Sequence, residues 1–175
     1  MEEKRKNFLK DFPFFLLISS LFLLTACGFQ PMYGINRDTP IGVEEALAQI
    51  EIGSIPHREG QYLRNALIDR FYLSGRPVNP VFTLSVTPVQ ETLVDLDITK
   101  SSDATRGQLR LETIMRLRDR KTNEKLLERK LRTITSYNIL GSEFATRVSE
   151  DNARTNALDD LARQIEHQLN LYFKR

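Results

Sequence analysis

Cys27 is the only cysteine of the 175-residue chain, and its position most constrains what the chain can fold into. Only the small residues Thr25 and Ala26 separate it from 13 mostly apolar residues, Phe12 to Leu24. These follow a start that contains Lys4, Arg5, Lys6 and Lys10. An apolar stretch of this length is typical of a signal peptide and is shorter than the roughly 20 residues that span a bilayer as a helix. We therefore expect residues 1–26 to be removed. The alternative is an uncleaved N-terminal anchor helix with an incidental cysteine.

Cleavage would leave 149 residues, which suits one domain with its own core. If Cys27 is modified, no thiol remains for a disulfide, and with only His57 and His167 left a zinc or haem site is poorly supplied. We predict no metal site. Residues 27–43 are rich in turn formers and suit a tether, so the domain is expected over residues 44–175.

Apolar spacing predicts two helices and a first strand. Residues 59–73 repeat an apolar position every four residues and are followed by Gly75 and Pro77, which end a helix. A second, long helix should begin between Ser142 and Ser149 and carry one apolar face, formed by Leu158, Leu161, Ile165, Leu169 and Tyr172. Weak alternation over residues 46–55 predicts the strand.

Three further stretches alternate as strands do. Within residues 82–98, the apolar side chains at even positions are expected on one face, with an edge, bulge or break at Pro88, which cannot donate to a strand ladder. Residues 108–118 and 125–140 place apolar side chains at odd positions, and a loop of residues 121–123 would set Glu112 opposite Arg132 and Arg116 opposite Glu128. The order of elements predicts an α+β fold, with two helices packed on one face of a four-stranded, mostly antiparallel sheet.

Charge is unevenly distributed along the chain. Residues 105–132 contain ten Lys and Arg against four Asp and Glu, whereas residues 27–104 contain six against ten and residues 133–175 contain five against six. The basic segment coincides with two of the predicted strands, whose outward faces carry five of its cations: Arg110, Arg116, Arg118, Lys130 and Arg132.

The sequence Leu24-Thr25-Ala26-Cys27-Gly28 resembles the lipobox of bacterial lipoproteins. The resemblance implies a thioether-linked diacylglycerol and an N-acyl chain on Cys27, which anchor the protein to a membrane by burying methylene groups. Gly28 stands where an aspartate often retains such proteins at the inner membrane, so the resemblance implies an outer-membrane location on the periplasmic side.

The run from Leu24 to Gly34, with its Gly-Phe-x-Pro-x-Tyr pattern after the cysteine, resembles the start of mature lipoproteins of the LptE family, of the alphaproteobacterial type. The similarity continues in Ser136-Tyr137-Asn138, in Phe144-Ala145 and in the helical pattern over residues 152–165. It implies two helices on a four-stranded sheet and a non-enzymatic role. Members of the family plug and help assemble the LptD β-barrel, bind lipopolysaccharide and assist its delivery to the cell surface.

With that role, the five outward cations are candidates for binding the phosphates of lipopolysaccharide, because Arg and Lys make charge-assisted hydrogen bonds to phosphate oxygens. The alternatives are a solvated face partly neutralised by Glu112 and Glu128, and contact with acidic groups that line the barrel. Export argues against a nucleic-acid partner.

No catalytic site is expected. The chain has no Gly-x-Ser-x-Gly motif, and the side chains of Asp159 and Asp160 diverge by about 100° on a helix, so we interpret them as a solvent-facing charge pair. The alternative function is a stand-alone periplasmic lipoprotein that carries a lipid or small ligand. Retention of a barrel partner distinguishes the two.

Overall fold

The computed structural model describes residues 42–98 and 104–174. The chain divides into two units, residues 1–34 and 35–175, and all described residues belong to the second. Cys27, the expected signal peptide and nearly all of the expected tether lie outside the described residues. None of the helices in the described part of the chain is long and apolar enough to cross a membrane.

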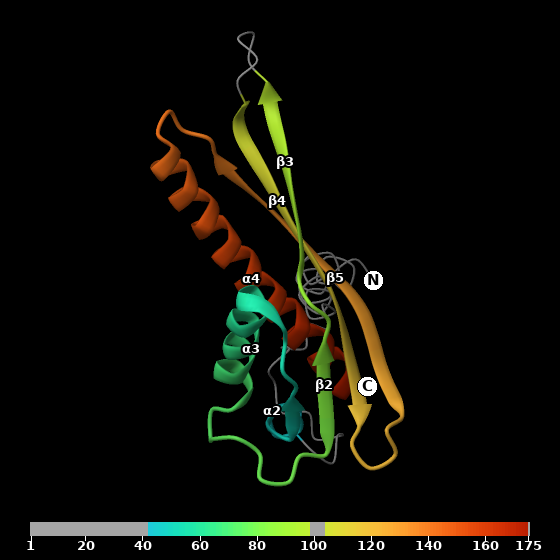
Figure 1. The fold of residues 1–175 in the computed structure, drawn as a ribbon. Coiled ribbons are helices and arrows are strands. Elements are labelled where there is room, and N and C mark those ends of the chain that lie inside the picture. Colours follow the sequence, from blue (N-terminus) through green and yellow to red (C-terminus); the bar gives the residue numbers. More distant parts are fainter. Residues whose placement is uncertain (1–41, 99–103, 175) are drawn as a thin grey trace, which may run out of the picture. The chain divides into compact units, whose positions relative to one another are not determined.

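The described residues form an α+β fold, as predicted, in which helices pack on one face of a five-stranded mixed sheet (Figure 1). The long strand β4 is central: it pairs with β5 along one side and with β2 and then β3 along the other, all antiparallel, while β1 adds to β2 in parallel. Helix α4 crosses β4 and β5, and α3 packs beside it. In chain order the elements are α2 (Val43–Ala48), β1 (Ile50–Ile52), α3 (His57–Phe71), β2 (Phe82–Val86), β3 (Gln90–Ile98), β4 (Ala104–Asp119), β5 (Lys125–Asn138) and α4 (Glu143–Phe173).

The strand predicted over residues 46–55 is wrong in its first part, because α2 occupies residues up to Ala48 and β1 is only three residues long. Glu, Ala and Leu favour a helix in this segment more than its weak alternation favours a strand. The hydroxyl of Tyr72 binds the backbone of β1. It accepts from Ile52 N at 3.2 Å and donates to Ile50 O at 2.6 Å.

The predicted second strand is split at Pro88 into β2 and β3, and its two halves turn opposite faces to the core. Val86 lies opposite Met115 and Gln90 opposite Glu112. The chain therefore advances four residues from β2 to β3 while β4 advances three. This extra residue is a bulge, which reverses the direction of every side chain beyond it. The prediction of one shared apolar face is therefore wrong: Leu84 is buried, but Val94 and Leu96 lie on the outward face.

The predicted pairing of β4 with β5 is confirmed. Glu112 lies opposite Arg132, and Arg116 lies opposite Glu128. The register shifts by one residue at Leu117/Arg118, which sets Arg118 opposite Lys125, so the connecting loop is longer than predicted.

Gly107 and Tyr137 lie opposite each other in β4 and β5, at the end of the sheet that is remote from the β4–β5 turn. The tyrosine ring covers the glycine so closely that an added Cβ would lie 2.6 Å from Tyr137 Cε1. Tyr137 is only 8% exposed, and this burial, followed by the charge of Glu150, raises the pKa of its hydroxyl. A side chain at position 107 would therefore force the ring of Tyr137 to move.

Ion pairs of Arg154 join α4 to strand β3 of the sheet. Arg154 donates from Nε and Nη2 to the two carboxylate oxygens of Glu91 in β3, at 2.8 Å each, and also binds Glu150 and Asp151 of its own helix. The Arg154 side chain is 20% exposed. A bidentate pair in this setting fixes both the position and the rotation of the helix.

Asp159 and Asp160 diverge as expected but are not merely solvent-facing. Asp160 accepts from Thr133 of β5 at 2.9 Å, and Asp159 accepts from Tyr62 of α3 at 3.2 Å. Both carboxylates therefore join α4 to neighbouring elements, which an isolated helical pattern does not reveal.

Within the described residues, the outer edge of β5 has no strand partner. Ile139 N donates to Thr105 O, so odd-numbered residues of β5 bond to β4 and even-numbered ones point to the free edge. Two of these edge carbonyls are occupied by side chains: Glu128 O accepts from Arg129 Nη1 at 2.8 Å, and Arg132 O accepts from Gln164 Nε2 at 3.2 Å.

Candidate anion-binding face of the sheet

The five predicted site residues share the outward face of β4 and β5. Odd-numbered β4 residues such as Leu109 and Met115 are fully buried under the helices, so the even-numbered residues point to the opposite side. The described helices do not cover this side (Figure 1). The structure therefore places all five cations on one surface, as predicted: Arg110, Arg116, Arg118, Lys130 and Arg132.

Besides Lys125 beside the β4–β5 turn, Arg106 is a further cation on this face that sequence reasoning missed. It lies in β4 between Leu96 of β3 and Asn138 of β5. The predicted strand starts at residue 108, whereas β4 begins at Ala104. The alternation of residues 104–118 was the signal that could have found it.

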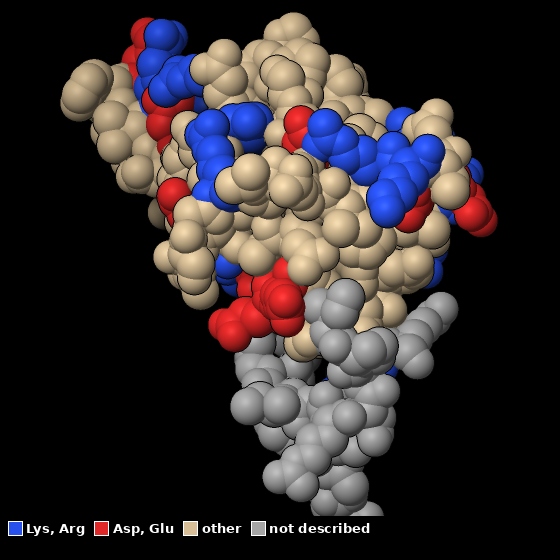
Figure 2. Space-filling view, turned by 90° about the horizontal axis from the view of Figure 1, so that it is seen from below, with Lys and Arg blue, Asp and Glu red and all other residues tan. Residues whose placement is uncertain are grey.

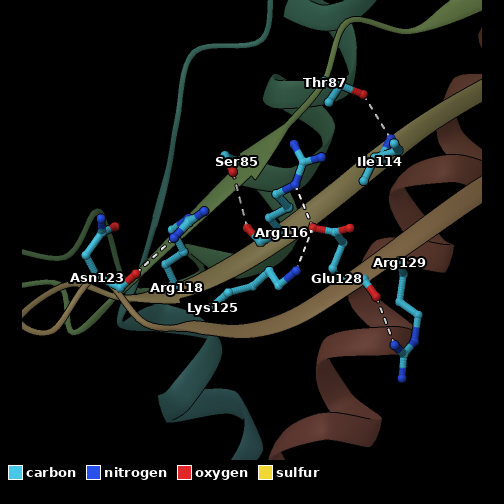
Figure 3. A network of polar contacts seen from close by, with 9 residues as sticks. All are labelled: Ser85, Thr87, Ile114, Arg116, Arg118, Asn123, Lys125, Glu128 and Arg129. Carbon is cyan, nitrogen blue, oxygen red and sulfur yellow. Dashed lines mark hydrogen bonds and ion pairs between the residues drawn. The ribbon is translucent and has the colours of Figure 1, made fainter.

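One set of outward side chains, which we call the hairpin group, lies near the β4–β5 turn and comprises Arg116, Arg118, Lys125 and Glu128. Arg116 Nε and Lys125 Nζ both contact Glu128 Oε2, at 2.8 and 3.3 Å (Figure 3). Arg118 Nη1 donates to the Asn123 carbonyl at 2.9 Å. The hydrogen bond from Arg116, and then that from Lys125, lowers the pKa of Glu128. All three cations of the hairpin group therefore have partners within the fold.

A second set, which we call the central group, comprises Arg110, Glu112, Lys130 and Arg132. Lys130 Nζ lies 2.6 Å from Glu112 Oε2, and Arg132 faces Glu112 across the two strands. The hydrogen bond from Lys130 outweighs desolvation and, with the charges of Lys130, Arg132 and Arg110, lowers the pKa of Glu112. Three cations therefore surround one carboxylate.

The donors of the central group are incompletely used. Arg110 Nε is buried and has no hydrogen-bond partner, and for Arg132 we find no ion pair within the described residues. Both groups carry the same formal charge of three cations and one anion, so they differ in how many of their cations have a partner rather than in net charge. Planar guanidinium groups with free N–H donors suit a phosphate or carboxylate ligand.

Glu112 and Glu128 neutralise part of the positive charge of this face, as one of the alternatives expected. Each carboxylate faces three cations, so most of the positive charge remains. Seen from the end where the β4–β5 turn lies, basic side chains form several separate groups, most of them next to an acidic side chain (Figure 2). Exposed ion pairs of this kind contribute little to stability, about 0–1 kcal/mol as a class. The face is therefore available for a ligand without a large loss of folding energy.

Other candidate sites are weaker. A pocket of about 170 Å³ between β5 and α4 is smaller than the roughly 300 Å³ typical of small-molecule sites. It is lined by Leu127, Arg129, Gln168, Leu171 and Tyr172. Across residues 42–98 and 104–174 we find no group of three or more potential metal ligands.

Comparison with known proteins links the fold to lipoproteins. Residues 47–169 match the LptE family, described as lipopolysaccharide-assembly. None of the curated proteins compared with the chain matches it.

Three solved structures share the fold. A putative lipoprotein from Caulobacter crescentus CB15 is 21% identical over 76% of this chain and 96% of its own, with a TM-score of 0.58. A minor lipoprotein from Acinetobacter baumannii is 22% identical over 70% and 90%, with a TM-score of 0.54. The rare lipoprotein B from Shewanella oneidensis is 10% identical over 69% and 92%, with a TM-score of 0.55.

Proposed function

The chain belongs to the LptE family of lipopolysaccharide-assembly proteins, and from this we propose that it plugs and helps assemble an LptD-type β-barrel and assists lipopolysaccharide transport and insertion at the cell surface. In this proposal it is a non-enzymatic outer-membrane lipoprotein on the periplasmic side, held by acyl chains on Cys27. The family match over residues 47–169 and the lipobox-like sequence around Cys27 support it.

We further propose that the outward face of β4 and β5 contacts the phosphates of lipopolysaccharide. The observation that carries this assignment is the central group, whose guanidinium donors exceed the acceptors that the fold supplies. Arg116 and Arg118 of the hairpin group would contribute mainly by their charge, since each already donates a hydrogen bond within the fold.

The barrel partner is tested by purifying the full-length chain through a C-terminal tag from detergent-solubilised outer membranes. We expect a stoichiometric large β-barrel to co-purify. Recovery of the chain alone in gentle detergent would contradict the plug role and favour the stand-alone carrier. A Cys27→Ser variant, which cannot take the diacylglycerol, should lose labelling by a palmitate analogue and leave the outer-membrane fraction.

Lipopolysaccharide contact is tested on the purified full-length chain in detergent. Arg110→Gln combined with Arg132→Gln should weaken binding about tenfold, because two charge-assisted contacts are lost. The matched control is Arg58→Gln with Arg76→Gln, which removes the same charge from two exposed arginines outside the face. Equal effects in both double variants would contradict the assignment of the face.

A further inference from the structure

We propose that Glu112 occupies the place of the ligand's anionic group: a phosphate of lipopolysaccharide displaces its carboxylate from Lys130 and is then bound by Arg110, Lys130 and Arg132. The inference rests on the proposed function, because it takes lipopolysaccharide as the ligand of this face. It adds that the face is occupied by an internal competitor, which the ligand must replace.

The position of Glu112 supports this role. Its carboxylate lies in the middle of the outward face, 2.6 Å from Lys130 Nζ and directly across the strands from Arg132. Arg110 precedes it on the same face of β4. The Glu112 side chain is 29% exposed and that of Lys130 is 65% exposed, so a ligand can reach the pair from solvent.

The hydrogen-bond donors of the three cations around Glu112 explain why a phosphate can replace its carboxylate. Of the cations around Glu112, only Lys130 makes a contact at ion-pair distance within the described residues, and Arg110 Nε is buried without an acceptor. A phosphomonoester carries three acceptor oxygens and a charge of about −1.5 to −2, whereas a carboxylate carries two oxygens and one charge. A phosphate can therefore accept from the exposed Arg132, for which no ion pair is found within the described residues, as well as from Lys130.

The hairpin group lacks this property although its formal charge is the same. Glu128 already binds both Arg116 and Lys125, and Arg118 is bonded to the Asn123 carbonyl. An anion that displaced Glu128 would break two ion pairs, whereas one that displaced Glu112 would break only the pair with Lys130. The exchange is therefore expected in the central group only.

The test compares two substitutions that change charge equally on the same face. Glu112→Gln and Glu128→Gln each remove one negative charge and keep the side-chain shape. With the full-length chain in detergent and lipopolysaccharide as the probe, we expect Glu112→Gln to bind roughly two- to fivefold more tightly than the wild type, the range typical of one exposed ion pair. Glu128→Gln should change the affinity less than 1.5-fold, because Glu128 pairs with Arg116 and Lys125, which do not hold the phosphate in this proposal.

Two further probes identify the group that is bound. With dephosphorylated lipopolysaccharide, Glu112→Gln should bind no more tightly than the wild type. Inorganic phosphate at millimolar concentration should leave the difference between the two proteins unchanged. If it abolishes that difference, the site takes free phosphate and the lipid assignment is overturned.

The outcomes separate this inference from the proposed function. Equal gains in Glu112→Gln and Glu128→Gln would mean that only long-range charge matters, and would overturn the competitor role. Unchanged or weaker binding by Glu112→Gln, together with a loss in the Arg110 and Arg132 double variant, would keep the face as the lipopolysaccharide site and overturn the competitor role. Absence of binding by the wild type would overturn lipopolysaccharide contact itself, and the inference with it.

Discussion

Replacing Gly107 by alanine should destabilise the protein although it adds a single methyl group. The new Cβ would lie closest to Cζ of Tyr137 and 2.6 Å from its Cε1 and Oη, and ordinary contacts begin at 3.4 Å, so the ring must move by more than about 0.8 Å or turn away. Tyr137 is 8% exposed and packed beneath α4, which leaves it little room. Overpacking of this kind costs about 1–3 kcal/mol, and we expect about 2 kcal/mol.

This destabilisation is opposite in sign to the usual effect of replacing a glycine by alanine. Gly107 does not have a positive φ, so alanine can adopt its backbone, and at such positions Gly→Ala stabilises by about 0.4–1 kcal/mol through the unfolded chain. Gly141 provides the matched control, because it also lacks a positive φ and a Cβ there would meet nothing within 4 Å. Gly141→Ala should be neutral or slightly stabilising.

Urea unfolding of the full-length chain in mild detergent, followed by circular dichroism, measures the difference. With a denaturant slope of about 2 kcal/mol per molar urea, a loss of 2 kcal/mol lowers the midpoint by about 1 M. In a Tyr137→Leu background, which removes the ring, the same alanine should cost nothing. Wild-type stability of Gly107→Ala, or an equal cost in the Tyr137→Leu background, would refute the packing explanation.

Three further predictions concern the contacts of α4. Arg154→Met should cost about 1–3 kcal/mol by leaving Glu91 and its neighbouring carboxylates unpaired, and hydrogen exchange should speed up in the first turns of α4 and in β3. Burial alone would raise the pKa of Asp160, but hydrogen bonds, including that from Thr133, hold it below its ordinary value of 3.8. Stability present above pH 4 is therefore lost on acidification, and Asp160→Asn should lose less in acid denaturation. Burial raises the pKa of Tyr137 above 10.0, so stability falls as the pH rises past 10, and Tyr137→Phe should lose less there in alkaline titration.

Each of these has its own control. Arg147, which pairs with Glu143 at an exposed position of the same helix, should be replaceable by methionine with little effect. Uniform exchange across the domain in Arg154→Met would contradict a local role for that residue. An acid profile of Asp160→Asn, or an alkaline profile of Tyr137→Phe, that follows the wild type would show that the group does not contribute.

The register of β4 and β5 was predictable because two independent signals agree. Apolar side chains alternate in both strands, and Glu112 with Arg132 and Arg116 with Glu128 form complementary pairs in one register only. The same alternation placed the five candidate residues on the outward face. Both results depend on spacing along the chain, which the sequence states directly.

The division of the face into two groups was not predictable. It depends on which carboxylate each cation reaches, and the register shift beside Arg118 moves that residue toward the turn carbonyl of Asn123. The face switch at Pro88 was also hidden, because Val94 and Leu96 keep the even spacing of β2 while the bulge reverses their direction. A proline indicates an irregularity but not the number of residues in it.

The occupied carbonyls of β5 limit how identical chains can associate. A fourteen-residue unpaired edge is long enough to template further strands, which is a common route to aggregation. Here an incoming backbone would find Glu128 O and Arg132 O already bonded to Arg129 and Gln164, so a continuous ladder could form only beyond Arg132. Two side-chain hydrogen bonds thus shorten the part of the edge that can pair with another strand to a few residues, and so oppose the joining of sheets edge to edge between neighbouring copies of the chain.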